Sequence, residues 1–230
     1  MDTTTSRISA VETEKRKFLA RTYGWMTIAL FVSALSAFFT TKSELLLNLI
    51  FGNRFGFFII AIAEIALVFY LSSCIQKMSV SSAVFFFLVY ATLNGITLSS
   101  IFFIYKMTSI VVAFISSALM FGTMSIYGLR TKQDLSSAGK YLGMAIWGLI
   151  IASLLNFLLK SNGLSWLISF ATVIIFTGLT AYDSQRILQA SNYANGSDTF
   201  KKAAVFGALQ LYLDFINMFL ALLRLFGRRK

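Results

Sequence analysis

Residues 164–187 read LSWLISFATVIIFTGLTAYDSQRI, and residues 203–223 read AAVFGALQLYLDFINMFLALL. Each run is apolar and long enough to cross a bilayer as a helix, which takes roughly 20 residues. Each also carries one aspartate, Asp183 in the first run and Asp214 in the second. An ionised aspartate near the centre of a membrane helix costs about 2.5 to 3.5 kcal/mol. A sequence that accepts this cost on two neighbouring spans is expected to use both carboxyl groups.

The composition of the whole chain is that of a polytopic membrane protein. Of its 230 residues, 57% are hydrophobic and 13% are charged, and the mean hydropathy of +0.77 lies outside the soluble range. Segments of about ten residues with alternating polar and apolar positions, the mark of a membrane β-barrel, are absent. We therefore predict an all-α bundle of seven membrane helices. The expected spans are residues 24–40, 55–73, 82–104, 109–129, 141–159, 164–187 and 203–225.

The basic residues predict how the chain is oriented in the membrane. Residues 1–23 form a basic segment without the apolar core of a signal peptide, expected in the cytoplasm as a short amphipathic surface helix, and residues 24–230 form a single membrane domain. Counted by side, 12 basic residues fall on the N-terminal side and 4 in the opposite loops, so the N-terminus is predicted to be cytoplasmic. Seven crossings place the basic tail, residues 224–230, outside and against this rule, unless one of the last two segments is re-entrant.

The net charge of +11 is assigned to lipid headgroups and not to nucleic acid, because the basic residues lie between the apolar runs. The chain has no histidine and one cysteine, Cys74, which excludes histidine triads, imidazole switches and an intramolecular disulfide. Proton chemistry near neutral pH then has to use carboxyl groups. Three acids fall inside the predicted spans, Glu64, Asp183 and Asp214. No cofactor is expected.

A small and polar stripe surrounds Asp214. Gly207, Gln210, Asp214, Asn217 and Ala221 recur at spacings of three and four and so share one helix face. On an otherwise apolar helix, such a stripe is expected to face the bundle interior or a wet cavity. The alternative is a polar seam that only holds helices together. A functional role is favoured, because an amide would serve that purpose without the cost of a charge.

Asp183 lies near the inner end of its span, three residues before Arg186, so a local ion pair is one reading. A second reading pairs Asp183 with Asp214 across one inner loop, residues 192–197. Two carboxyl groups in contact do not readily ionise together. A shared proton would then give a pH switch without histidine.

Glu64 lies in the middle of the second span. It is either a protonated core residue or a carboxylate on a cation path, and the path is favoured because hard cations such as Ca²⁺ prefer oxygen ligands. The predicted path residues are Glu64, Asn94, Gln210 and Asn217. Transient Ca²⁺ contact is expected at Glu64, Asp183 and Asp214.

Six strings resemble the bacterial branch of the Bax inhibitor family of membrane proteins, in order from the second span to the end. They are AEIALVFYLSS, YATLNGITLSSIF, MSIYGLRTKQDL, FTGLTAYDSQRI, NYANG and GALQLYLDFINMFLALLR. The resemblance implies seven helices with the last one central, a bacterial inner membrane location, and a pH-sensitive Ca²⁺ leak gated by two hydrogen-bonded aspartates. The aspartates match Asp183 and Asp214, and the acid near the outer mouth of the path matches Glu64.

One departure from the family pattern concerns a basic latch. Many members carry an arginine after the acid of the second span, where it can hold the aspartate of the sixth. Here that neighbourhood reads SSCIQK, with Cys74 at the place and Lys77 as the nearest base. Lys77 and Arg186 are therefore the candidates for the latch.

Three functions follow from these observations. The main prediction is a passive, pH-sensitive cation leak without enzymatic activity. The second is a membrane regulator that binds other membrane proteins, such as proteases or channels, without transporting ions. The third and most distant is an intramembrane aspartyl protease, which is disfavoured because the second aspartate lies in LYLD and not in a GxGD motif, and because the chain has no proline.

Overall fold

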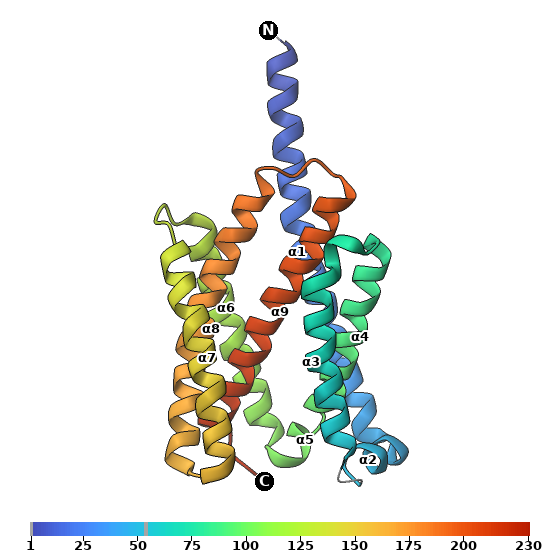
Figure 1. Cartoon of the computed structure of the whole chain (residues 1–230), viewed down its shortest axis with the longest axis vertical. Helices are drawn as coiled ribbons and strands as arrows, with labels where there is room; N and C mark the ends of the chain where they lie inside the picture. The colour runs from blue at the N-terminus through green and yellow to red at the C-terminus, as the bar shows by residue number, and fades with distance from the viewer. Residues whose placement is uncertain (1, 53–54) are drawn as a thin grey trace. The chain divides into compact units, whose positions relative to one another are not determined.

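A computed structural model describes residues 2–52 and 55–230, with side chains from Val11 onward. Seven of its helices are long and apolar enough to cross a membrane, as predicted. The elements in chain order are α1 (Asp2–Lys42), α2 (Glu44–Ile50), α3 (Gly56–Cys74), the 3₁₀ helix η1 (Ile75–Lys77), α4 (Val80–Leu98), α5 (Ile101–Ile104), α6 (Met107–Arg130), α7 (Ser136–Leu159), α8 (Asn162–Ser191) and α9 (Asp198–Phe226) (Figure 1).

The first helix differs from the prediction. Residues 1–23 were expected to hold a separate surface helix, but α1 runs without a break from Asp2 to Lys42, a length of 41 residues. The polar part is supported by the ion pairs Glu12–Arg16 and Glu14–Lys17, at spacings that stabilise helices. Because no proline interrupts the chain here, the polar segment simply continues the first membrane helix.

The last two long helices are also continuous. α8 has 30 residues and α9 has 29, so each is about 45 Å long at 1.5 Å per residue. Neither is broken as a re-entrant segment would be. Most helices extend past the predicted spans because their polar ends keep helical geometry beyond the apolar run.

The chain forms two compact units. The first contains the residues up to Ile104 together with Ala190–Tyr212, and the second contains Tyr105–Gln189 together with Leu213–Lys230. Helix α9 therefore begins in the first unit and ends in the second. It is the most buried span: 72% of its most apolar stretch is buried, against 39% or less in the other six. A central position for α9 stays a prediction.

In the first unit, small residues let α1 and α4 approach closely. A side chain at Gly95 would collide with the backbone of Ser33. The hydroxyl groups of Ser33 and Ser36 donate to the carbonyl oxygens of Ala91 and Thr92 at 2.7 and 2.9 Å. Small residues that allow close backbone contact, with hydroxyls bonded across it, are typical of membrane helix pairs.

Small residues also allow close helix contacts in the second unit. A side chain at Gly128 of α6 would collide with the carbonyl of Ala181 in α8, and one at Gly139 of α7 would collide with the Tyr182 ring of α8. Figure 1 shows α7 and α8 side by side. These contacts fix α8 on both sides, immediately before Asp183.

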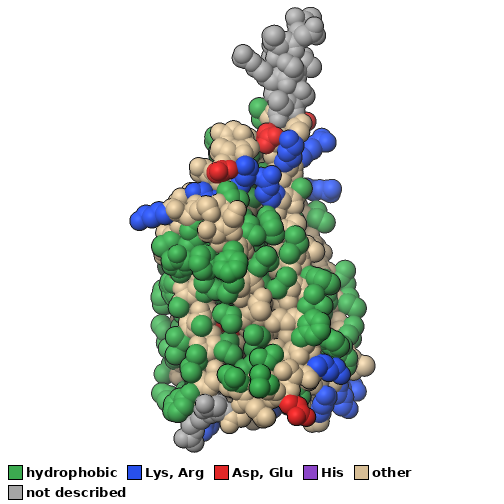
Figure 2. Space-filling view, turned by 90° about the vertical axis from the view of Figure 1, so that its right-hand side faces the viewer, with side chains coloured by type: hydrophobic (Ala, Val, Ile, Leu, Met, Phe, Trp, Pro, Cys, Tyr) green, Lys and Arg blue, Asp and Glu red, His purple; other side chains and the backbone are tan. Residues whose placement is uncertain are grey.

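Large apolar side chains cover the outer faces of the helices. Trp147 and Phe157 of α7 are 66% and 71% exposed. Figure 2 shows hydrophobic side chains over the helix flanks and Lys and Arg side chains near the helix ends. This is the surface of a protein that is embedded in lipid.

Candidate functional site

Asp183 of α8 and Asp214 of α9 meet within the second unit. The two residues are 6% and 4% exposed, and their carboxyl groups are in hydrogen-bonding contact. An ionised carboxylate only accepts hydrogen bonds, so a bond between two carboxyl groups requires a proton on one of them. The structure thus brings together the two acids that the sequence singled out.

One oxygen of this pair has no partner. Asp214 Oδ2 is buried and accepts no hydrogen bond from any described residue. Buried polar atoms are almost always bonded, so an orphan calls for a reason. This oxygen is available to a proton, a water molecule or a cation that reaches the pair.

The residues that follow Asp183 anchor α8 to its neighbours. The Ser184 hydroxyl donates to Ser125 Oγ of α6 at 3.0 Å. The Gln185 side chain donates to the carbonyl of Gln133 at 2.7 Å and accepts the N–H of Leu135 at 2.9 Å. Gln185 therefore holds the loop between α6 and α7 through two hydrogen bonds. Sequence reasoning missed these residues, although their place directly after the aspartate was a usable signal.

The latch candidates lie as follows. Arg186 is exposed, and it forms no salt bridge within residues 11–52 and 55–230. Lys77 is an exposed residue of η1 in the first unit, and Cys74 is a half-buried free thiol at the end of α3. A latch role for either base stays a prediction.

A second polar cluster lies in the first unit around the half-buried Glu64. Its Oε1 accepts the Thr97 hydroxyl at 2.5 Å, and its Oε2 accepts the Asn94 amide at 3.4 Å. Asn94 Oδ1 in turn accepts the Tyr212 hydroxyl at 2.9 Å, and Tyr212 also shares a 2.7 Å hydrogen bond with Ser33. Glu64 and Asn94, both predicted path residues, are thus directly bonded.

The aromatic ring of Tyr212 packs next to this cluster. The side chain is fully buried, and Phe87 and Tyr90 of α4 each meet it edge-on at 5.8 Å between ring centroids. Neither Tyr212 nor Ser33 was predicted. A tyrosine hydroxyl within the LYLD string was the only signal in the sequence, because a buried tyrosine needs a hydrogen-bond partner.

The other two predicted path residues are Gln210 and Asn217, and both are half-buried. The Asn217 amide donates to the Leu213 carbonyl of its own helix at 2.8 Å. Tyr212 and Asp214 are two residues apart, which places them on nearly opposite sides of α9. A single path through both clusters stays a prediction.

Metal binding was predicted at Glu64, Asp183 and Asp214. Among the residues that the structure describes, no three His, Cys, Asp or Glu side chains gather closely enough to hold a metal ion. The pair and the Glu64 cluster each offer carboxylate oxygens, which suit passing contact with a hard cation better than a resident site. Contact with Ca²⁺ stays a prediction.

Comparison with known proteins gives consistent matches. The family model described as "Inhibitor of apoptosis-promoting Bax1" matches residues 15–230. The chain is 46% identical over 215 residues to the inner membrane protein YbhL of Escherichia coli, covering 93% of this chain and 92% of that one. It is 45% identical over 217 residues to a protein of Borreliella burgdorferi, covering 94% of each. It is 39% identical to a membrane protein of Streptococcus pyogenes, covering 92% and 93%.

Proposed function

This chain belongs to the Bax inhibitor family of membrane proteins, and we propose that it forms a pH-sensitive cation leak, with Ca²⁺ as the transported ion. The contact between the buried carboxyl groups of Asp183 and Asp214 is the observation that carries the proposal. Membrane spans rarely hold ionisable groups, and those that do mark ion and proton pathways.

In this proposal the protonation of the pair sets the state of the leak. With one shared proton, the two carboxyl groups are bonded and hold α8 against the second half of α9. When the proton leaves, two negative charges about 4 Å apart repel by about 4 kcal/mol at an effective dielectric constant of 20. The helices then separate, or a cation takes the place of the proton. Either response couples ion passage to pH.

The Glu64 cluster supplies a second set of oxygen atoms for the same ion. Glu64 is held by Thr97 and Asn94, and among the described residues no Lys or Arg forms a salt bridge with its carboxyl group. Hard cations favour such oxygen ligands. We propose that Glu64 is a transient binding position for the ion along the path.

The test is Ca²⁺ flux into proteoliposomes that contain the purified protein. Wild-type flux should change with pH between about 5 and 8, where a coupled carboxyl pair titrates. Asp214→Asn should alter that change, because Asp183 then has no second carboxyl group with which to share a proton. Asp198→Asn, at the exposed start of α9, is the matched control. Unchanged flux with unchanged pH dependence in Asp214→Asn would refute the proposal.

Two alternatives give different outcomes in the same preparation. A regulator would show no flux at any pH and would co-purify with a membrane protein in fixed ratio. An intramembrane protease would cleave a helical peptide, and Asp214→Asn would stop the cleavage.

A further inference from the structure

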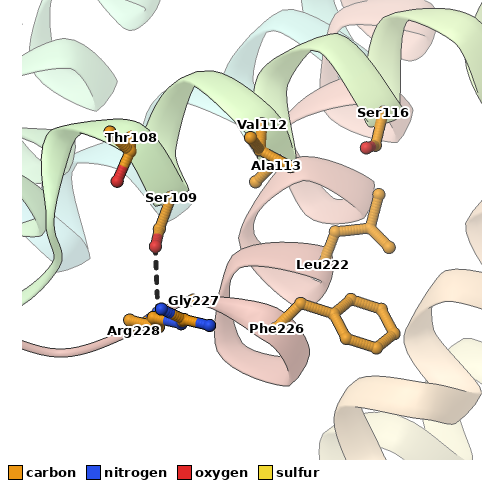
Figure 3. Close-up of a pocket in the computed structure, with 9 residues that line it drawn as sticks. All are labelled: Thr108, Ser109, Val112, Ala113, Ser116, Leu222, Phe226, Gly227 and Arg228. Atoms are coloured by element: carbon orange, nitrogen blue, oxygen red, sulfur yellow. Dashed lines mark hydrogen bonds between the residues drawn. The ribbon is translucent and has the colours of Figure 1, made fainter.

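A pocket of about 540 Å³ lies within the second unit, between the first three turns of α6 and the end of α9. Figure 3 shows α6 along one wall and α9 with the following tail along the other. The lining residues are Thr108, Ser109, Val112, Ala113, Ser116, Leu222, Phe226, Gly227 and Arg228.

The C-terminal tail is fixed beside this pocket by backbone hydrogen bonds. The N–H of Lys106 donates to the Arg228 carbonyl at 3.0 Å, and the N–H of Arg228 donates to Ser109 Oγ at 3.0 Å (Figure 3). Tyr105 and Arg229 form an antiparallel bridge next to them. Arg228 is thus held at the pocket by its backbone, while its guanidinium group is exposed.

The pocket has a polar end and an apolar end. Arg228 and the hydroxyls of Thr108 and Ser109 lie at the start of α6. Val112 and Ser116 follow at one-turn intervals, so the α6 wall extends about 12 Å. Opposite them are Leu222 and Phe226, one turn apart on α9. The Arg228 guanidinium and the two hydroxyls at one end of the pocket suit a phosphate ester. The apolar side chains at the other end suit an alkyl chain attached to that ester.

The charge of the tail is not explained by topology. Seven crossings place Arg228 on the side opposite the N-terminus, where the positive-inside rule disfavours it. Arg228 also forms no salt bridge with any carboxylate in the described part of the chain. Its charge is available to an external anion, and basic pockets between membrane helices bind lipid headgroups.

We propose that this pocket binds one anionic phospholipid of the surrounding bilayer. The lipid phosphate is bound by Arg228 and the hydroxyls of Thr108 and Ser109, and an acyl chain lies between Val112 and Phe226. The volume is within the usual range for ligand pockets, about 300 to 1,000 Å³. This site is independent of the proposed ion leak, which uses other residues.

Native mass spectrometry of the full-length protein in detergent, titrated with phosphatidylglycerol, tests the proposal. We expect one tightly retained phosphatidylglycerol and no equivalent phosphatidylcholine. Arg228→Gln should weaken retention about fivefold, the usual effect of one basic residue near an anionic lipid. Arg224→Gln removes the same charge one turn earlier in the sequence, from the last turn of α9, on the side of that helix away from Leu222 and Phe226, and should retain the lipid as the wild type does.

A second variant tests the apolar end without touching the charge. Val112 is 62% exposed, so Val112→Trp should fold and fill the groove, which would reduce phosphatidylglycerol retention. Equal retention in Arg228→Gln and Arg224→Gln, or equal binding of phosphatidylcholine, would overturn the proposal. Displacement of the lipid by inorganic phosphate would also overturn it, because the site would then select a soluble anion.

Discussion

Tyr212 connects three helices through a single hydroxyl group. Its oxygen bonds Ser33 of α1 and Asn94 of α4, while its ring fills the space beside Phe87. The oxygen and the ring can be separated experimentally, because phenylalanine has the same ring without the hydroxyl. The contribution of the polar cluster to stability can therefore be measured at this residue.

Tyr212→Phe should lower the free energy of unfolding by about 1 to 3 kcal/mol, because it leaves the buried Asn94 Oδ1 without its hydrogen-bond donor. Thermal unfolding of the purified protein in detergent is the measurement. Tyr141→Phe is the matched control, since Tyr141 is 70% exposed. If both variants unfold at the wild-type temperature, the hydroxyl of Tyr212 does not stabilise the fold.

The partners of Tyr212 show where sequence reasoning stops. Asp183 and Asp214 could be selected from the sequence, because a charge in an apolar span is costly wherever the span packs. Serine and tyrosine carry no such cost, and Ser33 and Asn94 lie 179 and 118 positions from Tyr212. Asn94 was predicted as a path residue, but only the packing of α1, α4 and α9 identifies Tyr212 and Ser33 as its neighbours.

At the scale of helices, Gly128 sets the distance between α6 and α8. A Cβ atom there would collide with the backbone of Ala181, whereas one at Gly122 of the same helix would meet nothing within 4 Å. The two glycines thus form a natural pair for comparison. Because Ala181 is two residues from Asp183, this contact also positions the acid pair.

Gly128→Ala should destabilise the protein by about 1 to 3 kcal/mol, since the backbones of α6 and α8 must move apart. Gly122→Ala should leave stability unchanged or raise it by about 0.5 to 1 kcal/mol, because alanine favours the helix. Chemical unfolding of both variants in detergent gives the comparison. Equal destabilisation of the two would mean that the α6–α8 contact is not close.

The start of α7 provides a prediction for acid conditions. Hydrogen bonds from the Ser136 side chain and backbone N–H lower the pKa of Asp134. A lowered pKa in the folded state stabilises the fold at neutral pH, and this contribution is lost as pH falls through that pKa. Asp134→Ala should therefore speed hydrogen exchange in the first turn of α7 at neutral pH, and the difference should disappear in acid. Lys132→Ala, in the same exposed loop, should show no such pH-dependent difference.

The helices themselves were largely predictable, and the errors have physical causes. Each apolar run became a helix because the bilayer interior admits few alternatives for the backbone. The separate surface helix expected in residues 1–23 was wrong because composition changes at Gly24 while helical geometry does not. A change in polarity along a helix marks the edge of the membrane and need not mark the end of the helix.

For the whole molecule, seven spans and the charged tail constrain the topology together. The helices α8 and α9 are unbroken, and the described part of the chain has seven long apolar helices, an odd number. An odd number of crossings puts the two termini on opposite sides of the membrane. The positive-inside rule alone would instead keep the tail, with Arg228 and Arg229, in the cytoplasm. A topology experiment decides between the number of helices and the charge of the tail.

Alkaline phosphatase fused after Lys230 should be active, and green fluorescent protein fused there should be dark, because seven crossings export the tail from the cytoplasm. Fusions after Lys140 follow four crossings and should give the reverse result, which makes them the internal control. The first helices dominate the orientation of a membrane protein, and a short tail follows them. The basic residues of the tail should therefore not keep it in the cytoplasm. A fluorescent fusion after Lys230, with the Lys140 control behaving as expected, would mean that α8 or α9 does not cross. The lipid phosphate proposed at Arg228 would then belong to the cytoplasmic leaflet.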